Sequence, residues 1–336
     1  MLKYPLEWVP NDMSEKNKDP NKLWRKAKEI IPGGNSFFSK RPEQFLGRGW
    51  PAYYKSAKGC EIITFDDTKY IDMALMGVGT CTLGYANNDV DKAVTKAIEA
   101  GTMSSLNCIE ELKLAEKLIE INPWSDMVKF TKSGGEANSL AIRIARISSK
   151  NDKVAICGYH GWHDWYLAAN LTDNNSLDDH LMSGLYSSGV PKALKGTTFP
   201  FKYNDINAIT SLVEDEEVGI IKMEVQRNEP PIDNFLVKVR ELCDKNNVIL
   251  IFDECTSGFR SNYGGLHLEL DVIPDLVMYG KAIANGYPLC AVVGKKEIMI
   301  EANKSFISST FWSERIGFAA ALKTLEIMES IESYKI

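Results

Sequence analysis

Apolar, strand-like runs alternate repeatedly with helical segments along this chain, and this alternation limits the folds that it can adopt. The clearest case is VGIIKME at 218–224, followed by the helical pattern FLVKVRELCDKN at 235–246 and then VILIFD at 248–253. A buried strand, a helix and a second buried strand indicate a βαβ unit with parallel strands. Such strands need a covering layer on both faces. The sequence therefore predicts an α/β fold, with a mainly parallel central sheet and helices on both faces.

The same alternation extends over most of the 336 residues. Further strands are predicted at 127–131, 153–158, 276–280 and 289–294, and further helices at 88–100, 110–121 and 136–146. Residues 1–87 are richer in loops and contain two short strand candidates around an Asp-Asp turn. We therefore expect an N-terminal segment over 1–87, a large ligand-binding domain over 88–312 and a long helix over 313–336.

Composition limits the partners and the cellular compartment that we expect for the protein. The formal net charge of −6 gives no reason to expect nucleic acid or an anionic membrane surface as a partner. No apolar run is long enough to span a bilayer, and the first residues lack the apolar core of a signal peptide. The seven cysteines form no CxxC pair and are odd in number, so reduced thiols in a cytoplasmic protein are the simplest interpretation.

The residues after each strand should carry the chemistry, because ligands of parallel sheets bind at the carboxyl ends of the strands. Ser133, Gly134 and Gly135 follow the strand at 127–131 and begin a helix, where N–H groups and the helix dipole favour a phosphate. The ring-rich stretch at 159–165, YHGWHDW, follows the next strand and could stack on a planar ligand. Its two histidines have no further ligands at metal-binding spacing, so we expect no metal.

Two ionisable residues end later strands. Asp253 ends VILIFD, and a carboxylate there is costly unless it has a partner such as a protonated ring nitrogen. Lys281 follows LVMYG, where a buried ammonium must be paired, neutral or bound covalently to a carbonyl group. Each feature alone also fits an ordinary role, as a helix start, a core plug, a cap or a lysine that reaches solvent. Together, at one sheet edge, they predict a pocket for a planar, phosphorylated pyridine aldehyde, pyridoxal 5′-phosphate (PLP).

Motifs spread over almost the whole chain match one known family. They include IPGGNS near the start, SGGEANSLAIRIAR (133–146), YHGWHD (159–164), FDECTSGFR (252–260) and PDLVMYGKAIANGYPLCAVVG (274–294). On these motifs the sequence resembles the class III aminotransferases, which are fold-type-I PLP-dependent transferases, and especially the glutamate-1-semialdehyde 2,1-aminomutase branch. The resemblance implies the same fold and PLP as the cofactor.

The resemblance also implies a role for each matching residue around the cofactor ring. Lys281 would bind PLP covalently as an imine and later move the substrate proton. Asp253 would pair with the protonated ring nitrogen. Cys255 and Tyr159 would lie on opposite faces of the ring, with His160 beside it.

Further contacts follow from the same resemblance. The backbone N–H groups of Gly134 and Gly135, with Ser133, would bind the phosphate, and Glu224 would lie near the ring hydroxyl. Thr310 resembles a threonine that reaches the phosphate of the neighbouring subunit, which implies a homodimer with shared active sites. The last matching positions fall on a stretch that contacts substrate in the aminomutase branch; they are Asn35 and Ser36.

Three departures from the family pattern indicate a changed substrate. Val225 replaces the proline that usually follows the glutamate, Gly135 replaces a hydroxyl residue, and FWSERIG at 311–317 replaces a run of small residues. We expect an aminotransferase that moves an amino group from an amino-acid donor to a carbonyl substrate, such as a keto-sugar, by a ping-pong mechanism.

Two alternatives stay open. An intramolecular aminomutase of the glutamate-1-semialdehyde type would use the same residues without an external donor. A truncated, non-catalytic protein of the same fold is the other alternative, because family members continue into a small C-terminal domain and this chain ends at Ile336, inside the long helix.

Overall fold

The computed structural model describes residues 20–44, 50–173, 175–180 and 184–336. The chain divides into two compact units. The first comprises Met1–Val78 and Gly84–Asn87, and the second comprises Gly79–Leu83 and Asn88–Ile336. Among the helices in the described ranges, none has the length and apolar character needed to cross a membrane.

The first unit contains a small antiparallel sheet in the order β1-β2-β3. Its strands are β1 (Tyr54–Lys58), β2 (Glu61–Thr64) and β3 (Lys69–Ile71). The two strand candidates around the Asp-Asp turn are thus confirmed as β2 and β3. The helices of this part of the chain are α1 (Pro20–Ile30), the 3-10 helices η2 (Phe38–Lys40) and η3 (Pro42–Gln44), and α2 (Met76–Gly79) at the boundary.

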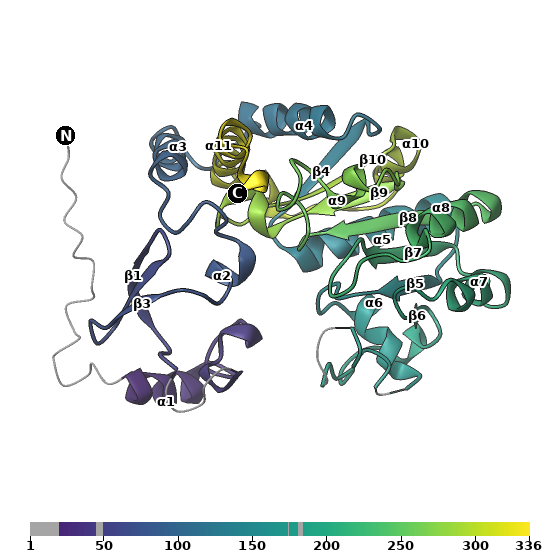
Figure 1. The fold of residues 1–336 in the computed structure, drawn as a ribbon, viewed down its shortest axis with the longest axis horizontal. Coiled ribbons are helices and arrows are strands. Elements are labelled where there is room, and N and C mark those ends of the chain that lie inside the picture. Colours follow the sequence, from purple (N-terminus) through teal and green to yellow (C-terminus); the bar gives the residue numbers. More distant parts are fainter. Residues whose placement is uncertain (1–19, 45–49, 174, 181–183) are drawn as a thin grey trace. The chain divides into compact units, whose positions relative to one another are not determined.

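The second unit is organised around a seven-stranded sheet in the order β4-β10-β9-β8-β7-β5-β6 (Figure 1). Its strands are β4 (Met127–Thr131), β5 (Val154–Cys157), β6 (Thr198–Pro200), β7 (Ile220–Glu224), β8 (Ile249–Glu254), β9 (Leu276–Tyr279) and β10 (Cys290–Gly294). Strand β10 is antiparallel to both of its neighbours, and the other pairs are parallel. The mainly parallel sheet is therefore confirmed, and so are the strands expected in it; β6 was not predicted.

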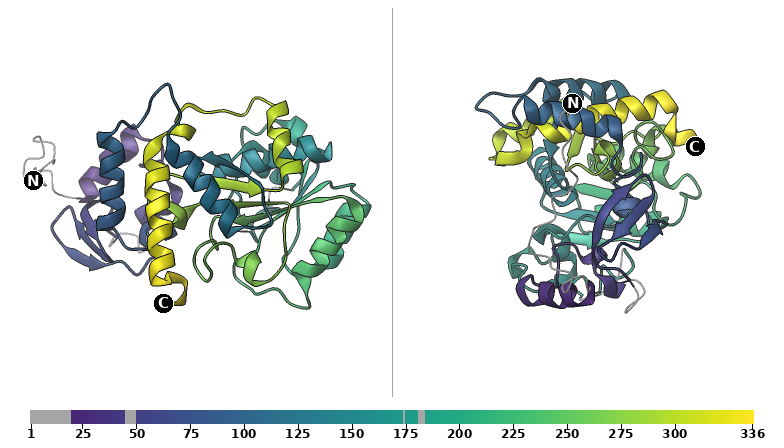
Figure 2. Two further views of the ribbon diagram at one scale, coloured as in Figure 1. Left: turned by 90° about the horizontal axis from the view of Figure 1, so that it is seen from above. Right: turned by 90° about the vertical axis from the view of Figure 1, so that its left-hand side faces the viewer.

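Helices cover both faces of this sheet, as expected. The layer on one face is formed by α5 (Gly134–Ser149), α6 (Asp164–Leu167) and α10 (Lys296–Met299). The layer on the other is formed by α3 (Asn88–Glu99), α4 (Ile109–Ile121), α7 (Ile206–Glu214), α8 (Phe235–Asn246) and α11 (Arg315–Ile331). Helix α11 packs against both α3 and α4, and the three lie side by side in Figure 2.

Shorter helices fill the connections of the second unit. They are α9 (Leu266–Glu269), η5 (Ala168–Leu171), η6 (Lys192–Leu194), η7 (Lys281–Ala284), η8 (Ile300–Lys304), η9 (Thr310–Ser313) and η10 (Ser333–Lys335). The long helical pattern expected over 313–336 is thus one α-helix, α11, between two 3-10 turns.

The alternation of side chains along the strands decides which layer each functional residue faces. In β8, Leu250 and Phe252 belong to the core beneath α7 and α8, whereas Ile249 and Ile251 belong to the core beneath α5. Successive side chains of a strand point to opposite faces. Asp253, two residues after Ile251, therefore faces the α5 layer.

Candidate active site

Asp253 is a buried carboxylate at the carboxyl end of β8, only 2% exposed. Its Oδ2 lies 2.8 Å from Nδ1 of His160, and its Oδ1 accepts a hydrogen bond of 3.0 Å from the N–H of Cys255. Burial alone would raise the pKa of Asp253, but the positive charge of Lys222 and the hydrogen bond from His160 outweigh it and lower the pKa to about 2. Asp253 is therefore ionised at neutral pH and suited to hold a positive charge on a ligand.

His160 supports this carboxylate. The imidazole is fully buried and lies against Trp165, with ring centroids 6.4 Å apart and an interplanar angle of 21°. Because Asp253 is ionised and can only accept, Nδ1 of His160 donates the hydrogen bond. Within the described part of the chain, Nε2 has no hydrogen-bond partner. The structure thus joins His160 to Asp253, and its predicted place beside a cofactor ring stays a prediction.

Lys281 begins η7, directly after β9. Its Nζ donates a hydrogen bond of 2.8 Å to Oγ1 of Thr256, on the turn after the neighbouring strand β8. The backbone of Lys281 has a φ of +33°, in the left-handed region that residues with a side chain rarely adopt. Strain of this kind persists where the surroundings impose it, and it concentrates at functional sites.

The thiol of Cys255 marks the point where three chain segments meet. A Cβ added to Gly134, at the start of α5, would lie 3.3 Å from Sγ of Cys255. A Cβ added to Gly280, just before Lys281, would lie only 2.6 Å from the same sulfur. The carboxyl ends of β8 and β9 and the amino end of α5 are therefore within a side chain's width of one another, as the sequence predicts.

The start of α5 offers an anion site, although one of its expected groups is already used. Ser133 caps the helix: its side chain accepts from the N–H of Glu136, and its own N–H donates to Oε2 of Glu136 at 2.9 Å. The N–H groups of Gly134 and Gly135 have no acceptor among the described residues. They are thus the free donors that the helix dipole would aim at a phosphate.

A side chain at position 135 would meet the imidazole of His163. A Cβ at this position would lie 2.6 Å from Cε1 of His163. A threonine or serine therefore could not replace Gly135 unless the imidazole moved.

Glu224 ends β7, beside Asp253 in the strand register, and is 5% exposed. Its Oε2 accepts hydrogen bonds from the N–H of Tyr159 at 3.1 Å and from Nη1 of Arg227 at 2.7 Å. Gly158 makes this approach possible, because it has a φ of +112° and its Cβ would lie 2.4 Å from Oε2. Tyr159 is thereby fixed near Asp253, and the pKa of its phenol is raised, chiefly by burial.

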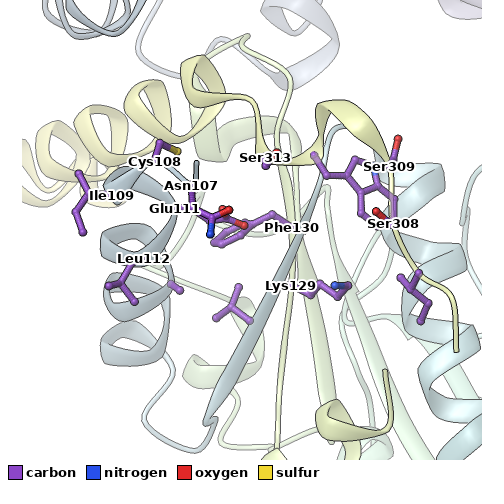
Figure 3. A pocket seen from close by; sticks show the side chains of 14 residues that line it. Asn107, Cys108, Ile109, Glu111, Leu112, Lys129, Phe130, Ser308, Ser309 and Ser313 are labelled. Atoms are coloured by element: carbon purple, nitrogen blue, oxygen red, sulfur yellow. The ribbon is translucent and has the colours of Figure 1, made fainter. Parts of the chain in front are cut away.

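Thr310 lies in η9, whose Trp312 donates a hydrogen bond of 3.1 Å to Oε1 of Glu136 at the start of α5. Thr310 is exposed and begins η9, beside a cavity of about 670 Å³ that is lined in part by the edge strand β4. In Figure 3, Ile109 and Leu112 of α4 lie on one side of the cavity, and Ser308 and Ser309 lie on the other. The role of Thr310 toward a neighbouring subunit stays a prediction.

Asn35 and Ser36 belong to the first unit, where they follow a tight loop. Gly34 has a φ of +85°, and its Cβ would lie 2.4 Å from the ring of Trp24. Asn35 Oδ1 is buried and has no hydrogen-bond partner among the described residues, whereas Ser36 is exposed. Their contact with substrate is untested and stays a prediction.

The residues at the strand ends fit PLP chemically. An ionised carboxylate suits a protonated ring nitrogen, an accessible amine suits an aldehyde, and two free N–H groups at a helix start suit a phosphate. These groups come from Asp253, Lys281 and the pair Gly134 and Gly135, which the contacts of Cys255 draw together.

Three residues near the site were missed by the sequence analysis. Thr256 has a weak signal, since it lies three residues beyond Asp253 on the same turn. Arg227 has none, because the loop after β7 has no regular pattern. Lys222 has an indirect one: it interrupts an apolar strand between Ile220 and Glu224, and the alternation of its neighbours places it on a covered face of the sheet.

Comparisons with known proteins provide independent evidence on the family. The family model for aminotransferase class-III matches residues 47–334. A 3-aminobutyryl-CoA aminotransferase of Cloacimonas acidaminovorans is 36% identical over 320 residues, which are 91% of this chain and 72% of that protein. A glutamate-1-semialdehyde 2,1-aminomutase of Sulfurisphaera tokodaii is 35% identical over 324 residues, which are 94% of this chain and 75% of that protein.

Solved structures are similar over the same extent. An omega-transaminase from Sphaerobacter thermophilus matches with a TM-score of 0.81 and 26% identity, covering 94% of this chain and 74% of that one. A transaminase with PLP bound matches with a TM-score of 0.81 and 25% identity, covering 92% of this chain and 73% of that one. The fold and the cofactor predicted from the motifs therefore agree with the comparisons.

Proposed function

Because this chain belongs to the class III aminotransferase family of PLP-dependent enzymes, we propose that it is an aminotransferase whose reaction takes place between Lys281 and Asp253. It moves an amino group from an amino-acid donor to a carbonyl acceptor. One observation carries the placement of the site: Sγ of Cys255 lies 3.3 Å from the Cβ position of Gly134 and 2.6 Å from that of Gly280. The helix start proposed to bind the phosphate and the lysine turn therefore adjoin the end of β8, which carries Asp253.

Each residue of the site has a distinct task. When bound, PLP supplies an aldehyde that takes up the amino group and a ring that accepts carbanion charge. Lys281 provides the amine for that aldehyde and, once released, the base that holds the substrate proton at Nζ. Asp253, fixed by His160, holds a positive charge at the ring nitrogen. Gly134 provides a backbone N–H for the phosphate, in line with the dipole of α5.

The acceptor that we propose is a keto-sugar. The departures near the site, where Val225 replaces the usual proline and Gly135 packs on His163 in place of a hydroxyl residue, support a changed acceptor. The choice of a keto-sugar follows from analogy with other enzymes of this fold. The names of the relatives supply the competing substrates, which are 3-aminobutyryl-CoA as a donor and glutamate-1-semialdehyde as a substrate of rearrangement.

Amino transfer can be tested with the purified chain loaded with PLP. A panel of amino acids and 3-aminobutyryl-CoA would be offered with keto-sugars, free and nucleotide-linked, and the aminated product would be measured. Initial rates would be measured against donor concentration at several fixed acceptor concentrations. Double-reciprocal plots of these rates should give parallel lines, which is the pattern of a ping-pong mechanism. Lys281→Ala should lose the activity, and Lys129→Met, on the edge strand β4, should keep it.

Two results would contradict this function. Failure of every donor to react, although PLP is bound, would exclude amino transfer by this chain. Rearrangement of glutamate-1-semialdehyde without any added donor would instead identify an aminomutase, which the similarity to the Sulfurisphaera enzyme favours as the second candidate.

We also propose a homodimer in which Thr310 serves the site of the partner subunit. The exposed position of Thr310 supports this, and so do the exposed apolar side chains of Leu106, Phe306 and Phe311. Lys281→Ala and Thr310→Ala proteins would be mixed after partial unfolding and refolded together. If the site is shared, one site of each mixed dimer regains both residues, and activity rises above that of either variant. No recovery in confirmed mixed dimers would contradict the shared site.

The cellular setting that we propose is a reducing one, such as the cytoplasm. All seven cysteines are free thiols. Alkylation of the protein directly in lysed cells, followed by mass measurement, should show seven modifiable thiols after denaturation, and a disulfide-linked pair would contradict this setting.

A further inference from the structure

Lys222 is a fully buried lysine in the middle of β7. It pairs in register with Ile156 of β5 and Ile251 of β8, which belong to the apolar core beneath α5. Its Nζ lies 3.2 Å from the thioether Sδ of Met278, and no carboxylate in the described ranges forms an ion pair with it. A buried ammonium without a direct partner is costly, so its surroundings need an explanation.

The position of Met278 shows where the ammonium lies. Met278 is the partner of Asp253 in the register of β8 and β9. The backbone of Lys222 lies opposite Ile251, two residues before Asp253 along the direction of the strands. Two residues along a strand span roughly 6.6 Å, about the length of an extended lysine side chain. The side chain of Lys222 therefore runs along the sheet toward the strand ends and brings its ammonium close to the carboxylate of Asp253.

Charged groups near Lys222 come from few elements. Asp253 and Cys255 approach it from β8 and the following turn, and Glu224 approaches it from β7. Strand β9 contributes the uncharged Met278, and α5 contributes apolar side chains to this core. Burial lowers the pKa of Lys222 to about 8, although the three acidic groups act in the opposite direction.

In this layer, the ammonium of Lys222 and the protonated ring nitrogen of a bound cofactor would share the carboxylate of Asp253. The charge of Glu224 is matched by Arg227 at 2.7 Å. Asp253 is then the carboxylate left for the ammonium of Lys222, and it is also the group expected to hold a protonated ring nitrogen. Two cations against one carboxylate repel each other strongly away from water.

We propose that Lys222 is a positioning residue that competes with the ring nitrogen of PLP for the single negative charge of Asp253. Binding of a cofactor with a protonated ring drives the ammonium of Lys222 to release its proton to solvent. Conversely, a charged Lys222 weakens the hold of the ring nitrogen on its proton. This inference rests on the role of Asp253 in the proposed function. It assigns to Lys222 a control of the cofactor's proton affinity, and hence of its capacity to accept carbanion charge.

The first test follows Lys222 itself. Protein labelled with carbon-13 lysine would be titrated by NMR, and the signal of Lys222 would be assigned by its absence in Lys222→Met. Without cofactor the midpoint should lie near pH 8. After loading with PLP, it should fall by about one pH unit or more, a tenfold change in proton affinity. In Asp253→Asn, PLP should no longer shift it. A midpoint that stays or rises in the loaded wild-type protein would overturn the inference.

The second test follows the cofactor. PLP labelled with nitrogen-15 in the ring would be bound to the wild-type protein, to Lys222→Met and to Lys129→Met. Lys129→Met removes the same charge from the edge strand β4 and serves as the matched control. The ring nitrogen should keep its proton to a pH higher by about one unit in Lys222→Met and should be unchanged in the control. Equal midpoints in the three proteins would overturn the inference.

Failure of the inference can be told apart from failure of the proposed function. Protein that binds PLP and transfers amino groups, but shows no coupling between Lys222 and the ring nitrogen, refutes the inference alone. If the protein binds no PLP at all, both the inference and the proposed function are refuted.

Discussion

Replacement of Lys222 by methionine should change how the stability of the protein depends on pH. Methionine has nearly the volume and flexibility of lysine without its charge, so it can fill the same place beside Met278. In the wild-type protein, burial lowers the pKa of Lys222 from 10.5 to about 8. Between these values the folded protein carries fewer protons on Lys222 than the unfolded chain does. Stability from this residue therefore rises with pH in that window, and the cost of the buried charge remains in full below pH 8.

The size of the effect follows from the two pKa values. A lowering from 10.5 to about 8 corresponds to about 3 kcal/mol, at about 1.4 kcal/mol for each pKa unit. Between pH 7 and pH 10, the integrated change is about 2 to 3 kcal/mol. The free energy of unfolding of the wild-type protein should thus gain about 2 to 3 kcal/mol relative to Lys222→Met over this range.

Urea denaturation of the cofactor-free proteins, at intervals between pH 7 and pH 10, measures this difference. Titration of the other lysines, tyrosines and cysteines affects both proteins alike and cancels in the comparison. Lys129→Met is the control, because it removes a lysine from the same sheet at a position that is not fully buried. It should run parallel to the wild-type curve. A parallel curve for Lys222→Met as well would refute the argument that Lys222 is a buried titrating group.

The remaining predictions concern the site and the thiols. Asp253→Asn should lower kcat/KM by about 100-fold or more, because the ring nitrogen loses its charge partner; an unchanged value in an enzyme assay would contradict its role. The stability that Asp253 contributes should be complete above pH 4 and be lost as the pH falls through about 2, so acid unfolding curves of wild type and Asp253→Asn should converge there. Gly280→Ala should lower the melting temperature and weaken PLP binding, because its Cβ would lie 2.6 Å from Sγ of Cys255, and normal PLP affinity would argue against this contact. Burial raises the pKa of Cys243 to about 12, so iodoacetamide should modify the exposed Cys60 much faster, and equal rates by peptide mass spectrometry would exclude the buried environment.

Much of the second unit could be predicted from the sequence because its strands are buried on both faces. Runs such as 248–253 are continuously apolar and end in a polar residue, so both the strand and its functional end are visible. The reversed direction of β10 was not visible, since an apolar run has no sign of its direction. Strand β6 is only three residues long and ends in Pro200, so it offers little pattern.

The site was predictable where a residue type conflicts with its surroundings. Asp253 and Lys281 follow apolar strands, and each raises the question of what compensates its charge. Lys222 raises the same question, but the run around it reads as an ordinary strand, and only the alternation of its neighbours shows that it points into a core. The use of the Ser133 N–H by Glu136 could not be predicted, because it depends on the orientation of one side chain.

The most direct test of the account is to identify the residue that binds the cofactor. PLP-loaded protein would be reduced with borohydride, digested and mapped by mass spectrometry. We expect the reduced cofactor on Lys281 in the wild-type protein and in Lys222→Met, and none on Lys281→Ala. Attachment to Lys222 or to another lysine, or binding of PLP without any covalent attachment, would contradict it.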